Sequence, residues 1–470
     1  MRNLLTIICF LICLYNTQSQ NTDLSESKSI NIENEYIPNI VGGVIISGSL
    51  NESMKMRSGT MFLYEIKGND NYILDSAQVG KNGFSFNEKL LNAGVYRIAY
   101  NNKTNTLDFV VNPKETSSLL IEINNNRIKT NYNIPNSLEN KIKKSYDQKE
   151  QSITSQIKLI KKSTKTRDQK IAEMTVLQQE LYDFGDNLNN QDSGTYIGMI
   201  LSHMKSKNEF VPHLYFNDIN FDDQSIVRSR LLPTRIQSYI QKYNDYKNNK
   251  YGFHDAIDLI MDYAKVNEVV AEFCMYNMLD GFYNTGQTSG DVMWEDLCNY
   301  IMDEYIFGEG CGDDIKPSDL LKERASQFKN LQIGKVPSNI NIADINGQNV
   351  NLKNLCKNNK YTVLMFWASH CNHCMQELPG FASWYNQNKA LDIEIVGVSL
   401  DANKKKWKST ISSNNFNWIN ICEFEVYKSP ICQDYKIKKT PTFFVLNRNM
   451  EIVLKPKSTN QLRSFLTSNK

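Results

Sequence analysis

Two cysteines separated by two residues, Cys371 and Cys374, are the side chains best suited to chemistry in this sequence. They follow an apolar segment, residues 361–366, which predicts a buried strand, and they precede a predicted helix that reaches about Asn388. Unpaired backbone amides and the helix dipole favour a thiolate at the start of a helix. We therefore predict that Cys371 is the nucleophile and that Cys374, one turn further into the helix, resolves the mixed disulfide.

A zinc or copper site is the alternative use of such a cysteine pair. Zinc needs a second pair of ligands, and neither Cys422 with Cys432 nor the histidines have the spacing. Copper would find soft ligands in His370, His373 and Met375, but no histidine follows His373 in the sequence. The pattern favours a redox pair that cycles between dithiol and disulfide, and it predicts no metal and no cofactor.

The segment from Ile333 to the C-terminus must position this pair, and its apolar pattern alternates strands with helices. Apolar residues around Asn346-Gly347 also predict a hairpin with a two-residue turn. The alternation indicates an α/β sheet with helices on both faces. The further predicted elements are strands at 393–399, near 418 and at 442–446, and helices at 404–413 and at the C-terminus.

The string FWASHCNHCMQELP, which spans residues 366–379, resembles the thioredoxin superfamily and, within it, the secreted TlpA/ResA-like thiol-disulfide oxidoreductases. The downstream segments VGVSLD (396–401), Ser429-Pro430, Tyr435 and Thr440-Pro441-Thr442 recur in the order expected of that family. The resemblance covers about residues 333–470. It implies a C-terminal α/β thioredoxin fold, disulfide exchange with protein thiol or disulfide substrates, and a membrane-bound redox partner that recharges the cysteine pair.

The same resemblance implies roles for residues around the cysteines. Thr440-Pro441 matches the family's cis-proline, which lies opposite the active cysteines and leaves the preceding backbone free to pair with a substrate chain; the alternative is a trans turn proline. Glu377 matches an acid that could accept the proton of Cys374 from the same helix face, and a solvated glutamate is the alternative. Trp367 matches an aromatic residue on the substrate side, for which core packing is an equally good explanation.

Two departures from the family's pattern also stand near the site. His370 replaces a tryptophan on the substrate side of the first cysteine, and Met365 replaces the buried aspartate of thioredoxin, so a proton relay must use another group. Asn372 and His373 separate the cysteines and should tune the redox potential. A histidine before the second cysteine resembles oxidising members of the superfamily, because it stabilises the reduced thiolate of Cys371 and raises the potential.

The N-terminus has the three-part plan of a secretory signal: Arg2, an apolar run over residues 4–15, and small or polar residues up to Ser19. We predict a signal peptide at residues 1–19 and export to the periplasm or cell envelope of a bacterium. A permanent membrane anchor is the alternative, but about twelve apolar residues are fewer than the roughly twenty of a spanning helix.

The remaining sequence predicts two accessory domains. Short strands broken by turns indicate an N-terminal antiparallel β-sandwich at residues 20–130, which contains no cysteine and no histidine. Charged segments with helical spacing indicate a central all-α helical domain at 131–330, followed by the thioredoxin-like domain at 331–470. The 53 basic and 51 acidic residues nearly cancel, so no nucleic-acid partner is predicted.

Two rival functions remain open from the sequence. A thiol peroxidase of the peroxiredoxin class shares the fold, but the positions of its key proline and hydroxyl residue are occupied by Leu364 and Ala368. A non-catalytic binding protein with a vestigial thioredoxin module is the other. Retention of both cysteines and of Thr440-Pro441 argues against the second rival.

Overall fold

The computed structural model describes residues 43–50, 59–68, 70–81, 83–101, 105–124, 127–129, 131–243, 251–289, 293–312, 315–388 and 391–469. The described chain divides into two compact units, with the boundary between Cys274 and Met275 in the helix α7, Glu268–Ser289. The predicted signal peptide lies outside the described residues. Among the helices of the described ranges, none combines the length and the apolarity that crossing a bilayer requires.

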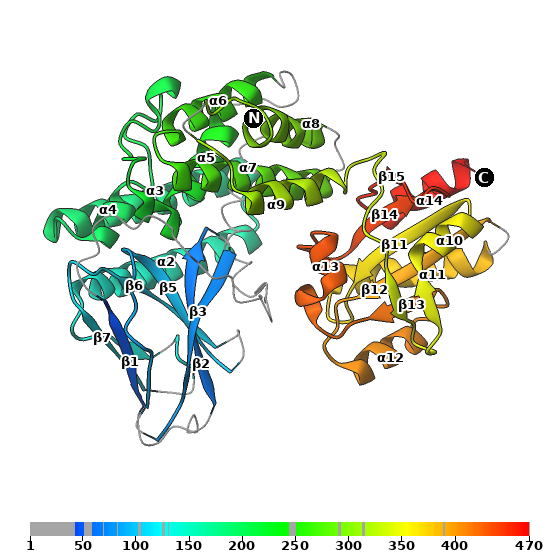
Figure 1. The fold of residues 1–470 in the computed structure, drawn as a ribbon, viewed down its shortest axis with the longest axis horizontal. Helices are drawn as coiled ribbons and strands as arrows, with labels where there is room; N and C mark the ends of the chain where they lie inside the picture. The colour runs from blue at the N-terminus through cyan, green and yellow to red at the C-terminus, as the bar shows by residue number, and fades with distance from the viewer. Residues whose placement is uncertain are drawn as a thin grey trace. The chain divides into compact units, whose positions relative to one another are not determined.

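Two four-stranded sheets, with the orders β4-β1-β7-β8 and β3-β2-β5-β6, occupy the N-terminal part of the first unit (Figure 1). Alternate residues of both sheets, such as Ile46, Leu63, Ile98 and Ile121, share one buried core. The strands are β1 Ile45–Leu50, β2 Thr60–Lys67, β3 Asp70–Gln78, β4 Gly83–Ser85, β5 Gly94–Tyr100, β6 Thr106–Val111, β7 Ser118–Ile123 and β8 Tyr132–Asn133.

The prediction that this region is wholly antiparallel is wrong at one pair of strands. β1 and β7 run parallel, with Ile45 opposite Ser118 and Leu50 opposite Ile123. Parallel neighbours require a long crossover connection, and here the chain forms the whole of the other sheet between β1 and β7. Local turn signals in the sequence do not reveal such a pairing.

The segment between the sheets and residue 330 is helical. The first helix begins at the N-cap Ser137, whose hydroxyl accepts from the Asn140 amide, and it buries Ile142, Tyr146 and Ile153 on one face. The α-helices are α2 Leu138–Lys162, α3 Arg167–Gln191, α4 Tyr196–Ser202, α5 Leu231–Tyr243, α6 Tyr251–Ala264, α7, α8 Met293–Tyr300 and α9 Asp319–Lys329; Pro212–Leu214 and Gln224–Arg228 are 3-10 turns, and Ile301–Ile306 is a π turn.

The C-terminal region forms a five-stranded sheet in the order β13-β12-β11-β14-β15 (Figure 1). β11, β12 and β13 are parallel, whereas β14 and β15 are antiparallel to their neighbours. The predicted thioredoxin fold is therefore present. Its elements are β9 Asn341–Ala343, β10 Asn349–Asn351, α10 Leu352–Asn358, β11 Tyr361–Trp367, α11 Asn372–Gln387, β12 Ile393–Ser399, α12 Lys404–Ser413, β13 Ile419–Cys422, 3-10 turn Val426–Lys428, α13 Pro430–Asp434, β14 Thr442–Leu446, β15 Ile452–Leu454 and α14 Thr459–Ser468.

The central strand β11 is apolar because both of its faces are covered. Met365 and Trp367 share a core with Phe381 of α11 and Leu462 of α14. Phe366, on the opposite face, packs on Tyr435 and Phe444. This double burial explains why the strand reads as a continuous apolar run rather than an alternating one.

The entry hairpin has a wider turn than predicted. The Asp344 amide donates to the Gln348 carbonyl, so three residues rather than two form the loop between β9 and β10. The Asp344 carboxylate accepts from the amides of Asn346 and Gln348, both at 2.8 Å. Gly347 adopts φ of 83°, a conformation that favours glycine. The aspartate side chain stabilises the longer loop.

Gly397 in β12 is required by close packing. A Cβ atom there would lie 2.6 Å from Trp418 Nε1 and 3.2 Å from Trp367 Nε1. We predict that Gly397→Ala lowers the free energy of unfolding by about 1–3 kcal/mol, the usual effect of overpacking a core. The measurement is urea unfolding followed by tryptophan fluorescence, since four of the five tryptophans, 367, 384, 407 and 418, lie in this region.

The matched control is Gly380→Ala in α11, where the nearest heavy atom to an added Cβ is Arg463 Nη2 at 3.5 Å. Alanine in an exposed helix interior should stabilise by about 0.5–1 kcal/mol. Equal unfolding midpoints for the two variants would contradict the packing argument.

Candidate redox active site

The sulfur of Cys371 caps the N-terminus of α11. Its backbone is extended, with φ of −82° and ψ of 106°, and its Sγ accepts a hydrogen bond from the Cys374 amide at 3.1 Å. The two cysteines form a disulfide, with their Cα atoms 5.3 Å apart. Cys371 is partly exposed, whereas Cys374 is fully buried. An incoming reactant therefore meets Cys371 first, which is the asymmetry that the predicted roles require.

A second segment, distant in sequence, completes the site. The Thr440–Pro441 peptide bond is cis, as the family resemblance implies. The Thr440 carbonyl oxygen lies 3.4 Å from Cys371 Sγ. A narrow recess beside this bond is lined by Lys439 and by residues 441–444 and 455–457. Burial lowers the pKa of Lys439 to about 8. This lysine of the recess therefore loses its charge in mildly alkaline solution.

Glu377 lies on α11 and joins it to the C-terminal helix. One carboxylate oxygen accepts from the Thr459 amide and from the Thr459 hydroxyl, both at 3.1 Å. The other oxygen lies 3.4 Å from Nδ1 of His373. A carboxylate at the start of α14 is stabilised by the unpaired amides there. Within the described part of the chain, its partners are thus Thr459 and His373 rather than Cys374.

The residue before Cys371 has an unexpected partner. His370 is largely exposed, and its Nδ1 lies 3.5 Å from Oδ1 of Asp401, a buried carboxylate just after β12. The amide and the hydroxyl of Ser369 both donate to Asp401. The only sequence signal for this contact was the position of Asp401 in the VGVSLD segment, and no role followed from it.

Comparison with known proteins supports the same conclusion as the geometry. Residues 358–452 match the family model described as thioredoxin-like. Sporulation thiol-disulfide oxidoreductase A of Bacillus subtilis is 29% identical over 136 residues, which cover 28% of this chain and 79% of that protein. Thiol-disulfide oxidoreductase ResA of Bacillus cereus is 26% identical over 147 residues, which cover 29% and 78%. The C-terminal region is a TlpA/ResA-like domain of the thioredoxin superfamily.

The solved structures include a similar domain. The crystal structure of the thioredoxin domain of a thiol-disulfide oxidoreductase from Bacteroides vulgatus has 25% sequence identity and a TM-score of 0.27. It covers 29% of this chain and 96% of that one.

The other predicted site residues of the ResA-like domain differ in their exposure to solvent. Trp367 is fully buried and packs edge-to-face on Phe416 at 5.2 Å between ring centroids, which favours core packing over substrate contact. Asn372 and His373 are exposed beside the disulfide. Met365, at the position of thioredoxin's aspartate, is fully buried in the core.

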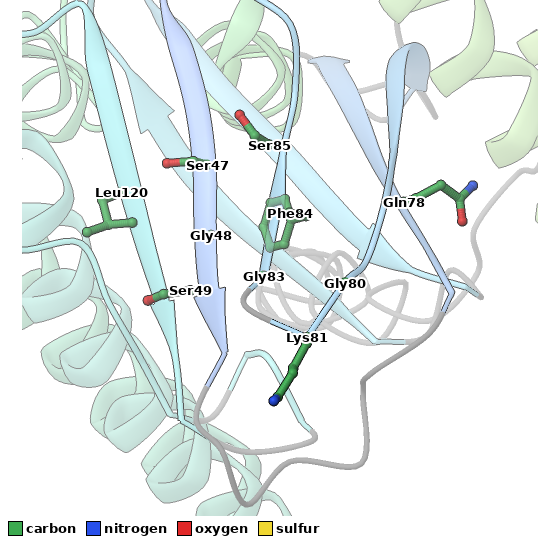
Figure 2. A pocket seen from close by; sticks show the side chains of 10 residues that line it. All are labelled: Ser47, Gly48, Ser49, Gln78, Gly80, Lys81, Gly83, Phe84, Ser85 and Leu120. Atoms are coloured by element: carbon green, nitrogen blue, oxygen red, sulfur yellow. The ribbon is translucent and has the colours of Figure 1, made fainter.

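The first unit contains a separate shallow depression, where β4 lies beside β1 (Figure 2). Its floor is formed by close backbone approach, because a Cβ atom on Gly83 would lie 1.8 Å from the Gly48 carbonyl oxygen. Lys81 projects from the loop at its rim (Figure 2). Its lining contains no cysteine, histidine or carboxylate among the described residues, so it offers none of the groups of a redox site.

The described part of the chain should present one reactive thiol, that of Cys371. Burial raises the pKa of Cys432 to about 12 and also raises the pKa of the thiols of Cys274, Cys298, Cys356 and Cys422. A buried neutral thiol is a poor nucleophile.

We predict that brief iodoacetamide treatment of the reduced native protein at neutral pH labels Cys371 at least about tenfold faster than any other described cysteine, because only Cys371 combines exposure with a helix N-terminus. Mass spectrometry of the digested protein measures the labelling. The unfolded protein is the control, in which all the cysteines should react at similar rates. Comparable labelling of Cys374 or Cys432 in the native protein would contradict the burial argument.

Proposed function

We propose that this protein is an exported thiol-disulfide oxidoreductase that exchanges disulfides with protein substrates through the Cys371-Asn-His-Cys374 pair. One observation carries the proposal. The partly exposed Cys371, which caps α11, has its Sγ 3.4 Å from the carbonyl oxygen of Thr440, the residue before Pro441. The names of the similar proteins, which are thiol-disulfide oxidoreductases, support the same reaction class.

The exchange proceeds in two balanced steps. In the reduced enzyme, the Cys371 thiolate attacks a client disulfide; a mixed disulfide forms and one client sulfur leaves as a thiolate that takes up a proton. Cys374 then loses its proton and attacks Cys371 Sγ, which releases the second client thiolate and forms the enzyme disulfide. The client is reduced by two electrons and the enzyme is oxidised by two. A membrane-bound redox partner returns the pair to its dithiol form.

The loop before β14 provides the client-binding edge. In this proposal the Thr440 backbone pairs with an extended client segment next to Cys371, as in the family that this domain resembles. His370 flanks the nucleophile on that side, and His373 stabilises its reduced form. The potential of the pair should consequently be less reducing than that of thioredoxin.

The remaining parts of the chain serve delivery and recruitment in this proposal. The signal peptide at residues 1–19 directs the protein to the periplasm or cell envelope of a bacterium. The β-sandwich domain at 20–130 and the helical domain at 131–330 act as accessory domains that select clients for the thioredoxin-like domain at 331–470. The charge balance of the whole chain, with a formal net charge of +2, fits protein clients better than nucleic acid.

A trapping experiment tests the reaction. Cys374→Ser should leave client proteins attached to Cys371, because the second step of the exchange is removed. The adducts are collected from cells that export the full-length protein. Dithiothreitol cleaves the mixed disulfides, and the released clients are identified by mass spectrometry. Cys371→Ser with Cys374→Ser is the matched control and should trap nothing. A folded, exported Cys374→Ser protein with a free Cys371 thiol and no reducible adducts would contradict the proposal and favour a binding protein.

A second experiment tests Glu377 as the group that takes the proton of Cys374. Glu377→Gln should slow resolution of the mixed disulfide near neutral pH by about a hundredfold, the lower end of what a positioned base contributes, while the first attack by Cys371 is unchanged. Stopped-flow measurements with a preformed mixed disulfide give the rate. Thr459→Val, which removes one donor to the carboxylate, is the control and should resolve at nearly the wild-type rate. Equal rates for Glu377→Gln and wild type from mildly acidic to mildly alkaline pH would leave Glu377 as an anchor for α14.

A further inference from the structure

A buried carboxylate, Asp401, lies behind the turn that carries the cysteine pair and is 3% exposed. Its Oδ2 accepts from the Ser369 amide at 3.0 Å and from the Ser399 hydroxyl at 2.8 Å. Its Oδ1 accepts from the Ser369 hydroxyl at 2.6 Å. Each of these donors offsets the cost of burying a charged oxygen, so the carboxylate and the turn that supplies two of the donors hold one another in place.

The same carboxylate also faces the side chain next to the nucleophile. Nδ1 of His370 lies 3.5 Å from Oδ1 of Asp401, and the His370 side chain is 59% exposed. His370 directly precedes Cys371 in the chain, so this contact ties the residue next to the partly exposed cysteine to Asp401. Asp401 thus contacts both residues that directly precede Cys371, through the Ser369 amide and hydroxyl and through the His370 ring.

We propose that Asp401 is a positioning residue for Cys371, which acts by holding the Ser369 turn and the His370 ring beside the nucleophilic sulfur. This inference rests on the proposed function, because it concerns the reactivity of the cysteine that performs the exchange. Within the described residues Asp401 contacts neither sulfur of the pair, so its effect passes through its two neighbours. In this proposal the held ring offers an N–H dipole to the thiolate.

Other titratable groups lie around this cluster. Cys422, at the end of β13, donates its thiol to the Asp401 carbonyl oxygen at 3.3 Å, and burial raises its pKa, so it remains neutral. His373 and Glu377 lie on α11, and Lys404 begins α12 shortly after Asp401. Substitution of the Asp401 side chain leaves all of these groups in place, so they form a constant background.

The direction in which removal of the Asp401 charge shifts the pKa of the Cys371 thiol separates a positioning role from a direct one. A carboxylate acting directly on the Cys371 thiolate would repel it, so removing the negative charge would favour the thiolate. A carboxylate that acts by holding His370 favours the thiolate, so removing the charge would disfavour it. The two roles therefore predict shifts of opposite sign in the pH dependence of Cys371 reactivity.

The experiment is the pH dependence of Cys371 alkylation in the reduced full-length protein, measured by mass spectrometry of the peptide that contains Cys371. Asp401→Asn keeps the shape of the side chain, and we expect it to raise the pH midpoint by about half a unit, the size of a partly exposed charge interaction. In a His370→Gln background the same substitution should raise the midpoint by clearly less, because only the Ser369 turn then transmits the effect. Ser399→Ala removes a donor on the strand side and should leave the midpoint at its wild-type value.

Two outcomes would overturn the inference: a lower midpoint in Asp401→Asn, or an equal rise with and without His370. If Asp401→Asn fails to fold, Ser369→Ala loosens the turn and should raise the midpoint by a smaller amount. An unchanged midpoint in both Ser369→Ala and His370→Gln would then overturn it. Failure of the proposed function is distinguishable, because the wild-type protein itself would then neither reduce a protein disulfide nor trap clients through Cys374→Ser.

Discussion

The hydrogen bond from the Cys374 amide to the Cys371 sulfur, at 3.1 Å, is the contact on which the site depends. It places the sulfur at the N-terminus of α11, where unpaired amides and the helix dipole favour negative charge. The same geometry puts Cys374 inside the first turn, where it is buried and yet bonded to its partner. One local arrangement therefore provides both an accessible sulfur and a protected one.

Three long-range contacts hold this local arrangement against the rest of the domain. Asp401 binds the turn before the pair, Glu377 connects the helix after it to the start of α14, and the Thr440 carbonyl faces the nucleophile. Each contact comes from a different element of the fold. A catalytic group held from several directions loses little freedom when it reacts, which is the physical advantage of building the site on a packed sheet.

The cysteines of the ResA-like domain differ in how far they are buried. Cys356, Cys422 and Cys432 are buried near the same sheet, and desolvation keeps their thiols neutral. Cys371, in contrast to these three, both reaches solvent and lies at a helix N-terminus. In an oxidising compartment, this contrast would confine disulfide exchange to one position without any need for structural disulfides elsewhere in the domain.

The sequence by itself determined the features that depend on residues close together in the chain. The apolar run 361–366 predicted the central strand, the C-x-x-C spacing predicted the capped helix and the partner cysteines, and the family resemblance identified Thr440-Pro441 as a cis bond. The strand and the capped helix follow from periodicity and helix capping, which act over a few residues, whereas the cis bond was implied by the resemblance.

Only the tertiary structure decided which distant groups meet. The contact of Asp401 with His370 spans more than thirty residues, that of Glu377 with Thr459 spans 82, and the parallel pairing of β1 with β7 spans a whole sheet. Packing also resolved Trp367 in favour of the core. Such contacts depend on how burial of apolar surface packs the helices and strands together. The position of a carboxylate in the sequence does not show which donors surround it after folding.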